Sequence, residues 1–405
     1  MQTNITQAFL QTRDGKEAES ILRSCVHCGF CTATCPTYQL LGDELDSPRG
    51  RIYLIKQVLE GQAVTTKTRT HLDRCLTCRS CETTCPSGVR YGRLVDIGRE
   101  IVEQHVPRNA LENTSRFLLR QLIPYPKRFA PLLKLGQLFK PVLPKAMQNK
   151  IPTVQKPRNW PTQIQPRKML VLAGCAQQVV TAQTNVSTAA VLNKLGIQLI
   201  TAEKAGCCGA VSHHLSAAEE AKRFIKQNID AWWPFIKAGA EAIVVTASGC
   251  GVMLKDYAHI MQDDAEYAEK ARQVTELAKD ISEILRNENF ADLQTTPQKS
   301  SVSFHSPCTL QHGLQLSGVV ENILQQVGYN LKHVDDSHLC CGSAGTYSVL
   351  QPKLSKQLLA HKITALENDQ PDIIATANIG CQMHLDTKAS VPVKHWIELV
   401  EQALI

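Results

Sequence analysis

The pattern of hydrophobic and polar positions divides this chain of 405 residues into a helical first part and a second part where strands alternate with helices. In the first part, Ser47 and Pro48 are typical of a helix start, and the apolar positions of RIYLIKQVLE continue that helix to Gly61. In the second part, four short apolar runs predict buried strands: KMLVLAGC, AIVVTASGC, SVSFHSPC and DIIATANIGC. The stretch from Ser216 to Ala238 predicts a helix that opens with a capping box of Ser216 and Glu219.

The second part of the chain repeats itself. Cys175, Cys207 and Cys208 recur 133 positions later as Cys308, Cys340 and Cys341, and Cys250 recurs 131 positions later as Cys381. Each copy opens on a strand-like run, passes a CCG triplet and reaches a second apolar run before its last cysteine. A shared offset across four pairs indicates two tandem modules, and the alternation of strands and helices favours α/β modules with largely parallel sheets. We expect the two modules to be related by a pseudo-twofold axis.

Charge and composition add a boundary between the two parts. From Asn113 to Met169 the chain has twelve Lys or Arg residues, no Asp or Glu, and nine prolines between Pro124 and Pro166. Such a segment predicts short amphipathic helices followed by an extended linker. Nucleic acid, an anionic lipid surface or an acidic partner would each explain its charge, as would a solvated linker.

The expected fold class is therefore α+β and multidomain, with a mostly helical N-terminal domain and two tandem α/β cysteine-rich modules. The expected boundaries are 1–112 for the N-terminal domain, 113–167 for the basic Pro-rich linker, 168–295 for the first module and 296–405 for the second. The sixteen cysteines occur without a recognisable secretory signal, so we expect a reducing compartment where cysteines bind metal or do redox chemistry. No apolar run approaches the length of a membrane span.

Two cysteine runs in the N-terminal domain carry the strongest chemical signal. CVHCGFCTATCP and CLTCRSCETTCP both have the spacing C-x2-C-x2-C-x3-C-P, which is typical of [4Fe–4S] clusters and unlike that of zinc sites. In two-cluster ferredoxins the fourth cysteine of each run binds the other cluster. That pairing assigns Cys25, Cys28, Cys31 and Cys85 to cluster 1, and Cys75, Cys78, Cys81 and Cys35 to cluster 2. Five arginines flank the runs and either favour the reduced clusters or lie on the surface: Arg49, Arg51, Arg74, Arg79 and Arg90.

The CCG triplets are a second candidate for chemistry. Gly209 and Gly342 would let the backbone approach a bulky group. The cysteines of each module would hold a further cluster, form a thiol redox site, or lie buried and inert. The candidate metal or redox residues are Cys175, Cys207, Cys208, Cys250, Cys308, Cys340, Cys341 and Cys381. Histidines that could assist lie nearby in sequence: His213, His214, His305, His312, His338 and His384.

Motifs for flavin, nicotinamide or nucleotide binding are not found in the sequence. Oxidation of an organic substrate by two electrons needs an organic cofactor, because iron–sulfur clusters accept electrons singly. We therefore expect any flavin to belong to a partner, no catalytic residue on this chain, and no nucleic-acid partner.

Together these motifs resemble the family of respiratory dehydrogenase subunits that combine two ferredoxin-type clusters with CCG modules. Within this family, the chain resembles the bacterial glycolate oxidase iron–sulfur subunits most clearly in four segments: SCVHCGFCTATCPTYQLLGDELDSPRGRIYLIKQVLEG, NIDAWWP, TASGCG and DSHLCCGSAGTY. The resemblance implies electron transfer from two flavin-binding subunits, which oxidise glycolate to glyoxylate, toward a membrane acceptor such as quinone. It implies a protein that is cytoplasmic or attached to the inner face of the membrane.

Two alternatives stay open. The chain could be a subunit of a related lactate or glycerol-3-phosphate dehydrogenase, or a thiol–disulfide reductase that uses the CCG cysteines. In heterodisulfide reductase the last cysteine of each module begins a C-x-x-C pair that supports a non-cubane cluster. Met253 and His384 stand at the partner positions here, so a cluster of that kind is not expected.

Overall fold

The computed structural model describes residues 1–142, 144, 148, 151–154, 156–288, 293, 295–296 and 298–404. The fold divides into two compact units. The N-terminal unit is formed by Met1–Ser115 together with His338–Lys362, and the sheet unit by Arg116–Ser337 together with Ile363–Ile405. The expected boundaries at 113, 168 and 296 stay predictions, and the third falls in a stretch that is described only in part.

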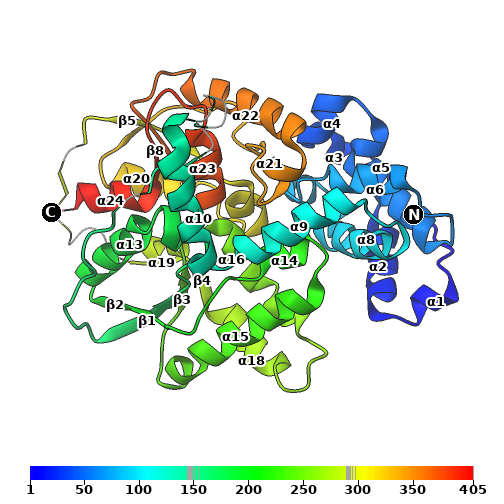
Figure 1. Ribbon diagram of the computed structural model, residues 1–405, viewed down its shortest axis with the longest axis horizontal. Coiled ribbons are helices and arrows are strands. Elements are labelled where there is room, and N and C mark those ends of the chain that lie inside the picture. The colour runs from blue at the N-terminus through cyan, green and yellow to red at the C-terminus, as the bar shows by residue number, and fades with distance from the viewer. Residues whose placement is uncertain are drawn as a thin grey trace. The chain divides into compact units, whose positions relative to one another are not determined.

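The N-terminal unit is helical, as the sequence predicts (Figure 1). Its elements are α1 (Gln7–Leu10), α2 (Arg13–Ser24), α3 (Phe30–Ala33), α4 (Pro36–Leu41), the 3-10 turn η1 (Glu44–Asp46), α5 (Pro48–Leu59), α6 (Thr66–Asp73), α7 (Ser80–Thr83), α8 (Tyr91–His105), α21 (Tyr347–Leu350) and the start of α22 (Pro352–Glu367). Helix α9 (Ala110–Leu122) crosses from this unit into the other.

Helix α5 begins where the sequence predicts. The Ser47 hydroxyl caps it by accepting a hydrogen bond from the Gly50 backbone N–H at 2.9 Å, and Pro48 takes the first turn. The helix packs against α2 and α8. A Cβ at Gly98 on α8 would lie 2.6 Å from Ile55, so this glycine allows the close contact between α8 and α5.

The sheet unit contains two four-stranded parallel sheets of the same topology, ordered β2-β1-β3-β4 and β6-β5-β7-β8. The first consists of β1 (Arg167–Val171), β2 (Ile197–Thr201), β3 (Ile243–Val245) and β4 (Ala278–Asp280). The second consists of β5 (Ser301–His305), β6 (Asn330–Leu331), β7 (Ile373–Thr376) and β8 (Val393–His395). All four predicted strand runs are therefore confirmed, as is the parallel arrangement.

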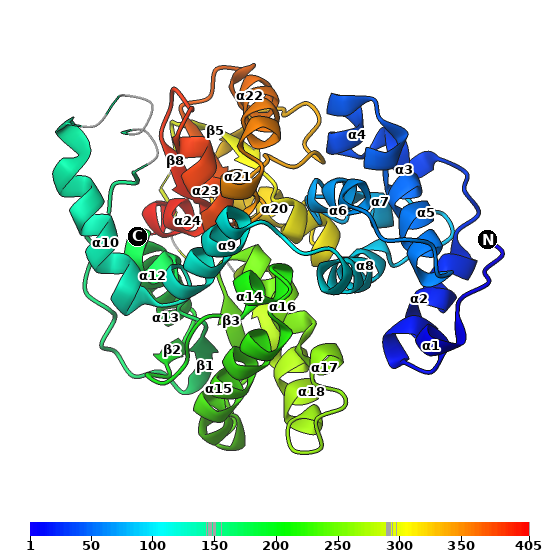
Figure 2. The ribbon, with the colours of Figure 1, turned by 45° about the vertical axis from the view of Figure 1, so that its right-hand side comes forward.

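Helices surround both sheets (Figures 1 and 2). They are α10 (Pro126–Phe139), η2 (Lys140–Val142), α12 (Gln177–Val180), α13 (Gln183–Lys194), α14 (Ala210–His214), α15 (Ala218–Lys237), α16 (Ser248–Lys255), α17 (Tyr257–Ile260), α18 (Ala268–Leu277), α19 (Ile281–Arg286), the π turn η3 (Thr309–Gly313), α20 (Val319–Gln326), α23 (Ile379–Asp386) and α24 (Trp396–Ala403).

Helix α13 of the first module packs against α24 of the second, and α19 packs against α20. These contacts are reciprocal, as a pseudo-twofold repeat requires. Residues of both sheets share one hydrophobic core that includes Val244, Val302 and Trp396.

The predicted capping box at the start of α15 is wrong. Ser216 adopts a left-handed backbone with φ of 58°, and the Ala217 N–H donates to the Ser212 carbonyl at 2.9 Å. This turn delays the helix start to Ala218, and the N-cap makes no side-chain hydrogen bond. The basic segment forms α9, α10 and η2, and the described residues from 151 to 166 have no regular secondary structure, as predicted.

Candidate functional site

Two loops of the N-terminal unit curl around their cysteines in the same way. His27 and Gly29 in the first loop, and Thr77 and Arg79 at the matching positions of the second, all have positive φ angles between 54° and 89°. Residues with left-handed backbone in such short loops form concave nests, whose N–H groups favour anionic groups. In the second loop the Thr77 N–H donates to the Cys75 sulfur at 3.4 Å.

The first group of thiols lines one cavity. The cavity is lined by Cys25, Cys28, Cys31 and Cys85 and also by Cys81, with Phe30, Ile52, Val89 and Tyr91 among the other lining residues. Burial and the neighbouring Cys25 raise the pKa of Cys31 to about 11. The last cysteine of the second run, Cys85, therefore lies with the first three of the first run.

The second group gathers around Cys81, which is buried on α7. Burial, and then the nearby thiols of Cys78, Cys75 and Cys35, raise the pKa of Cys81 well above its usual value. Cys35, the last cysteine of the first run, thus lies with the first three of the second run. The last cysteine of each run thus lies near the first three cysteines of the other run. The assignment of the eight cysteines to two clusters stays a prediction.

The spacing of these thiols fits a group larger than a single ion. Four thiolates on one tetrahedral zinc, with Zn–S bonds of about 2.3 Å, would lie roughly 3.8 Å apart. Among the described residues, no three cysteine sulfurs lie all within 4.8 Å of one another. Eight thiolate donors in two groups suit two iron–sulfur clusters.

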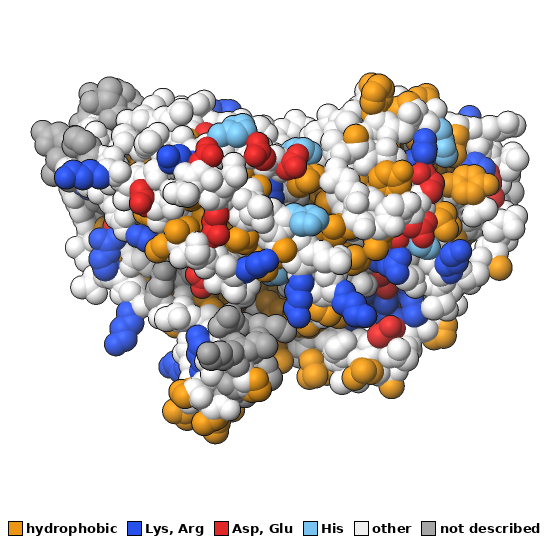
Figure 3. Space-filling model, turned by 90° about the horizontal axis from the view of Figure 1, so that it is seen from above, with side chains coloured by type: hydrophobic (Ala, Val, Ile, Leu, Met, Phe, Trp, Pro, Cys, Tyr) orange, Lys and Arg blue, Asp and Glu red, His pale blue; other side chains and the backbone are white. Residues whose placement is uncertain are grey.

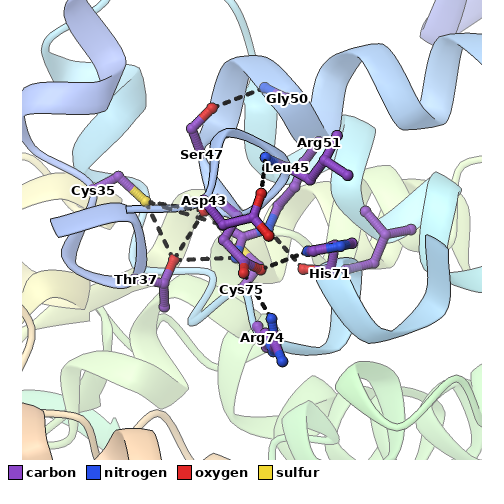
Figure 4. A network of polar contacts seen from close by, with 12 residues as sticks. Cys35, Thr37, Asp43, Leu45, Ser47, Gly50, Arg51, His71, Arg74 and Cys75 are labelled. Carbon is purple, nitrogen blue, oxygen red and sulfur yellow. Dashed lines mark hydrogen bonds and ion pairs between the residues drawn. The ribbon is translucent and has the colours of Figure 1, made fainter. Parts of the chain in front are cut away.

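A buried charge network adjoins the second group (Figure 4). The Arg51 side chain on α5 is 1% exposed, and its Nη1 lies 3.9 Å from the Cys35 sulfur. Its Nε donates to the His71 carbonyl at 2.7 Å, and its Nη2 donates to Asp46 at 3.3 Å and to Thr37 at 3.1 Å. A guanidinium without solvent contact is thus held beside a predicted cluster ligand.

Asp46 at the end of η1 holds this network together. Its Oδ1 also contacts the His71 Nδ1 at 3.0 Å, and its Oδ2 accepts a hydrogen bond from Arg74 at 2.8 Å. The two arginines exceed the one carboxylate, so the network contributes net positive charge next to Cys35.

Four of the five flanking arginines can be assigned to different environments. Arg51 is buried and Arg74 joins its network, whereas Arg90 pairs with Glu17 at 3.3 Å at the surface. Arg49 pairs with Glu44 at 2.7 Å and lines the cavity of the first thiol group. Sequence position alone does not distinguish them.

Two residues near Cys75 were not found by sequence reasoning. The Arg99 Nη2 donates to the Cys75 carbonyl at 2.6 Å, and the Tyr91 hydroxyl donates to the Cys75 sulfur at 3.6 Å. Burial alone would raise the pKa of Cys75, but Arg51 and Arg99 together lower it. Both residues lie on α8, well after Cys75 in the sequence, and no sequence motif marks them.

The first CCG module brings its four thiols together in the sheet unit. Cys207 contacts Cys175 and Cys208, and Cys208 also contacts Cys250. Hydrogen bonds with its thiol neighbours, and then burial, raise the pKa of Cys207, whereas hydrogen bonds from Cys207 and Cys250 lower the pKa of Cys208. Of the candidate histidines, His214 contributes to the lowering at Cys208.

Two buried side chains hold the Cys207–Cys208 backbone in place. Asn228 on α15 donates to the Cys207 carbonyl at 2.8 Å and accepts from the Gly206 N–H at 2.7 Å. The Tyr257 hydroxyl donates to the Cys208 carbonyl at 2.8 Å and accepts from Asn228 at 3.0 Å. Cys207 and Cys208 are nearly inaccessible to solvent, which disfavours reaction with a protein disulfide.

The CCG glycines have a local structural reason. Gly209 and Gly342 both have left-handed backbone, with φ of 92° and 88°. A Cβ at Gly209 would lie 3.3 Å from the Ala221 carbonyl oxygen, and a Cβ at Gly342 would lie 2.7 Å from that of Ser355. The glycines thus permit close approach to the backbone of α15 and of α22, respectively. The sequence had suggested that they make room for a bulky group instead.

The cysteines of the second module belong to different units. Cys308 and Cys381 lie in the sheet unit, whereas Cys340 and Cys341 lie in the N-terminal unit. The Gly342 N–H donates to the Cys340 sulfur at 3.4 Å, which repeats the contact between Gly209 and Cys207 at 3.5 Å. The grouping of these four cysteines stays a prediction.

Comparison with known proteins adds family information. Residues 21–89 match the family model of the 4Fe-4S dicluster domain, and residues 169–255 and 302–386 each match that of the cysteine-rich domain. The glycolate oxidase iron-sulfur subunit of Escherichia coli K12 is 56% identical over 100% of this chain and 99% of its own length. The probable glycolate oxidase iron-sulfur subunit of Bacillus subtilis 168 is 32% identical over 91% of this chain and 89% of its length.

Two more distant similarities concern half of the sequence in one case and the fold in the other. Lactate utilization protein A of Bacillus velezensis is 28% identical over 50% of this chain and 84% of its own length. The crystal structure of a hypothetical protein from Helicobacter pylori has a TM-score of 0.57 at 11% identity, covering 98% of this chain and 74% of that one. Among the described residues, no helix is long and apolar enough to cross a membrane.

Proposed function

The chain belongs to the family of glycolate oxidase iron–sulfur subunits, and from this premise we propose that it relays electrons within a flavin-linked glycolate oxidase complex. Electrons from the oxidation of glycolate to glyoxylate on partner flavin subunits would pass through this chain toward a membrane acceptor such as quinone. The observation that carries the proposal is the pair of crossed thiol groups within the region that matches the 4Fe-4S dicluster domain.

The ligands follow from the two groups. Cys25, Cys28, Cys31 and Cys85 hold cluster 1, and Cys75, Cys78, Cys81 and Cys35 hold cluster 2. Each cluster supplies one-electron chemistry when bound. The crossed ligands tie the two sites to one small helical core, and Arg51 and Arg99 compensate the negative charge of the thiolates around Cys75.

The first CCG module supplies a second site, in which Cys175, Cys207, Cys208 and Cys250 act as a buried metal or redox centre. The contacts among their four sulfurs and the lowered pKa of Cys208 support this role. The flavin subunits and the membrane acceptor lie outside this chain, and we place the protein in the cytoplasm or at the inner face of the membrane.

The test of the relay starts with the protein purified without oxygen. We expect about eight iron and eight sulfide per chain from the two N-terminal clusters. Together with its flavin subunits, the protein should show bleaching of the cluster absorbance when glycolate is added. A preparation that binds zinc and cannot be reconstituted with iron would contradict the proposal, and faster bleaching with lactate would instead favour the lactate alternative.

Two matched cysteine variants locate the iron. Cys81→Ser should lose about four iron per chain, because its buried sulfur is central to the second group. Cys208→Ser makes the same chemical change in the first CCG module. An iron content above eight that falls with Cys208→Ser would identify a further cluster, and a content that stays near eight would leave that module as a thiol site.

A further inference from the structure

Helix α10 exposes an unusual face. Leu132, Leu135, Leu138 and Phe139 on this helix are all exposed, Leu138 to 73%, whereas Leu133 is only 7% exposed. Residues three and four positions apart share one face of a helix. The outward face of α10 is therefore apolar. Figure 3 shows hydrophobic side chains gathered on the lobe that protrudes at the lower edge of the view. Figure 2 shows α10 at the margin of the sheet unit.

This arrangement is the reverse of an ordinary surface helix. A helix at the surface of a soluble protein turns charged residues outward and its apolar stripe toward the core. Large exposed apolar patches mark sites where another molecule binds. The next turn continues the face with Val142 in η2, which is 78% exposed.

The charges around this face indicate what binds there. Lys127, Arg128 and Lys134 lie on the same helix, and the whole segment from Asn113 to Met169 has no acidic residue. Within the described part of the chain, neither Lys127 nor Lys134 has an acidic partner.

Three arginines elsewhere in the segment are already paired with acidic residues. Arg120 pairs with Glu220, Arg158 with Glu401, and Arg167 with Glu241 and Glu288. Among the described residues, Lys127 and Lys134 are not paired in this way, and both lie on the helix with the apolar face.

We propose that α10 docks the protein on an anionic phospholipid surface, with Leu132, Leu135, Leu138 and Phe139 in the interface and Lys127 and Lys134 facing the headgroups. Leucine and phenylalanine on one face with basic residues beside them are typical of helices that lie in a membrane interface. This inference rests on the proposed function, in which the electron acceptor lies in the membrane. It supplies the element that would bring the relay to that acceptor.

The test measures binding of the full chain, loaded with its clusters, to vesicles by flotation. Vesicles of phosphatidylglycerol and phosphatidylcholine should bind the protein, and vesicles of phosphatidylcholine alone should bind it at least tenfold more weakly. High salt should weaken binding to the anionic vesicles by the same factor. The double variant Leu135→Glu, Leu138→Glu should reduce the partition to anionic vesicles by at least tenfold. The double variant Lys127→Gln, Lys134→Gln should reduce it several-fold.

Leu111→Glu is the matched control, because Leu111 on α9 is 81% exposed and lies outside α10. It should leave vesicle binding unchanged. Equal binding of wild type and the α10 double variant, or equal loss with Leu111→Glu, would overturn the proposal. The proposal would also be overturned if the wild-type protein were a dimer that the α10 variant converts to a monomer. The same holds if the α10 variant alone abolished binding of the flavin subunits, because in both cases a protein would cover this face.

The outcome is separable from that of the electron relay. Vesicle binding needs neither flavin subunits nor glycolate, and the α10 variants change exposed side chains far in sequence from the N-terminal cysteines. An α10 variant with normal iron content and glycolate-dependent bleaching but no vesicle binding would support both. A failed relay with intact vesicle binding would reject only the proposed function.

Discussion

Replacing Arg51 by glutamine should lower the reduction potential of one cluster far more than that of the other. Arg51 is a buried cation beside Cys35, and reduction adds negative charge to the cluster that Cys35 is proposed to hold. Loss of the cation therefore disfavours the added electron and makes the potential of cluster 2 more negative.

The magnitude follows from the distance. A unit charge about 4 Å from another interacts by about 4 kcal/mol at an effective dielectric constant near 20. The added electron spreads over the whole cluster and lies farther from the guanidinium than the Cys35 sulfur at 3.9 Å. We take about half of that energy, ~2 kcal/mol, which corresponds to roughly 90 mV for a one-electron couple.

The assay is a potentiometric titration followed by electron paramagnetic resonance, which records reduction of both clusters. One step should move by roughly 90 mV in Arg51→Gln, while the other moves much less. Asp46→Asn should move the same step in the opposite direction, because it removes a negative charge from the same network. A merely structural role for the network would not produce shifts of opposite sign.

Arg49→Gln is the matched control, since Arg49 is paired with Glu44 and lines the cavity of the first thiol group, outside the network of Arg51. It should leave the cluster 2 step in place. The reasoning would be refuted if Arg51→Gln moved both steps equally, or if Arg51→Lys, which keeps the charge and loses the fork of hydrogen bonds, lowered the potential as much as Arg51→Gln did.

Further predictions concern the sheet unit. Asn228→Ala should lower the free energy of unfolding by about 2–3 kcal/mol, because it leaves the buried Cys207 carbonyl without this donor; urea denaturation measures this, and exposed Gln227→Ala should change it by less than about 0.5 kcal/mol. Burial lowers the pKa of His395 to about 4, although its Nε2–H donates to the Thr246 carbonyl at 2.7 Å. The unfolded chain then binds more protons below pH ~6.5, so this histidine should cost about 2 kcal/mol of stability between pH 7 and pH 5. His395→Gln should remove that part of the pH dependence, and an unchanged difference between the two pH values would contradict the assignment.

Local patterns in the sequence were sufficient for the elements and for the two metal-binding runs. The start of α5 at Ser47 and Pro48 was predictable because capping and proline act within one turn. The strands β1, β3, β5 and β7 were predictable because short apolar runs repeat at a constant offset. The capping box at Ser216 failed because a left-handed backbone at that residue moved the helix start, which composition does not encode.

Tertiary structure alone decided which charged groups surround the thiols. Arg49 and Arg51 are two positions apart on the same helix, yet one lines the cavity of the first thiol group and the other is buried beside Cys35. Arg99 and Tyr91 reach Cys75 only because α8 packs against α5 and α6.

The sequence determined that thiols suited to two clusters occur in two runs, because ligand spacing is a local property of the chain. Their electrostatic environment, and the outward apolar face of α10, depend on how helices pack. Burial removes the solvent that screens a charge, so the effect of Arg51 on its neighbours is set by the folded structure and not by its position in the sequence.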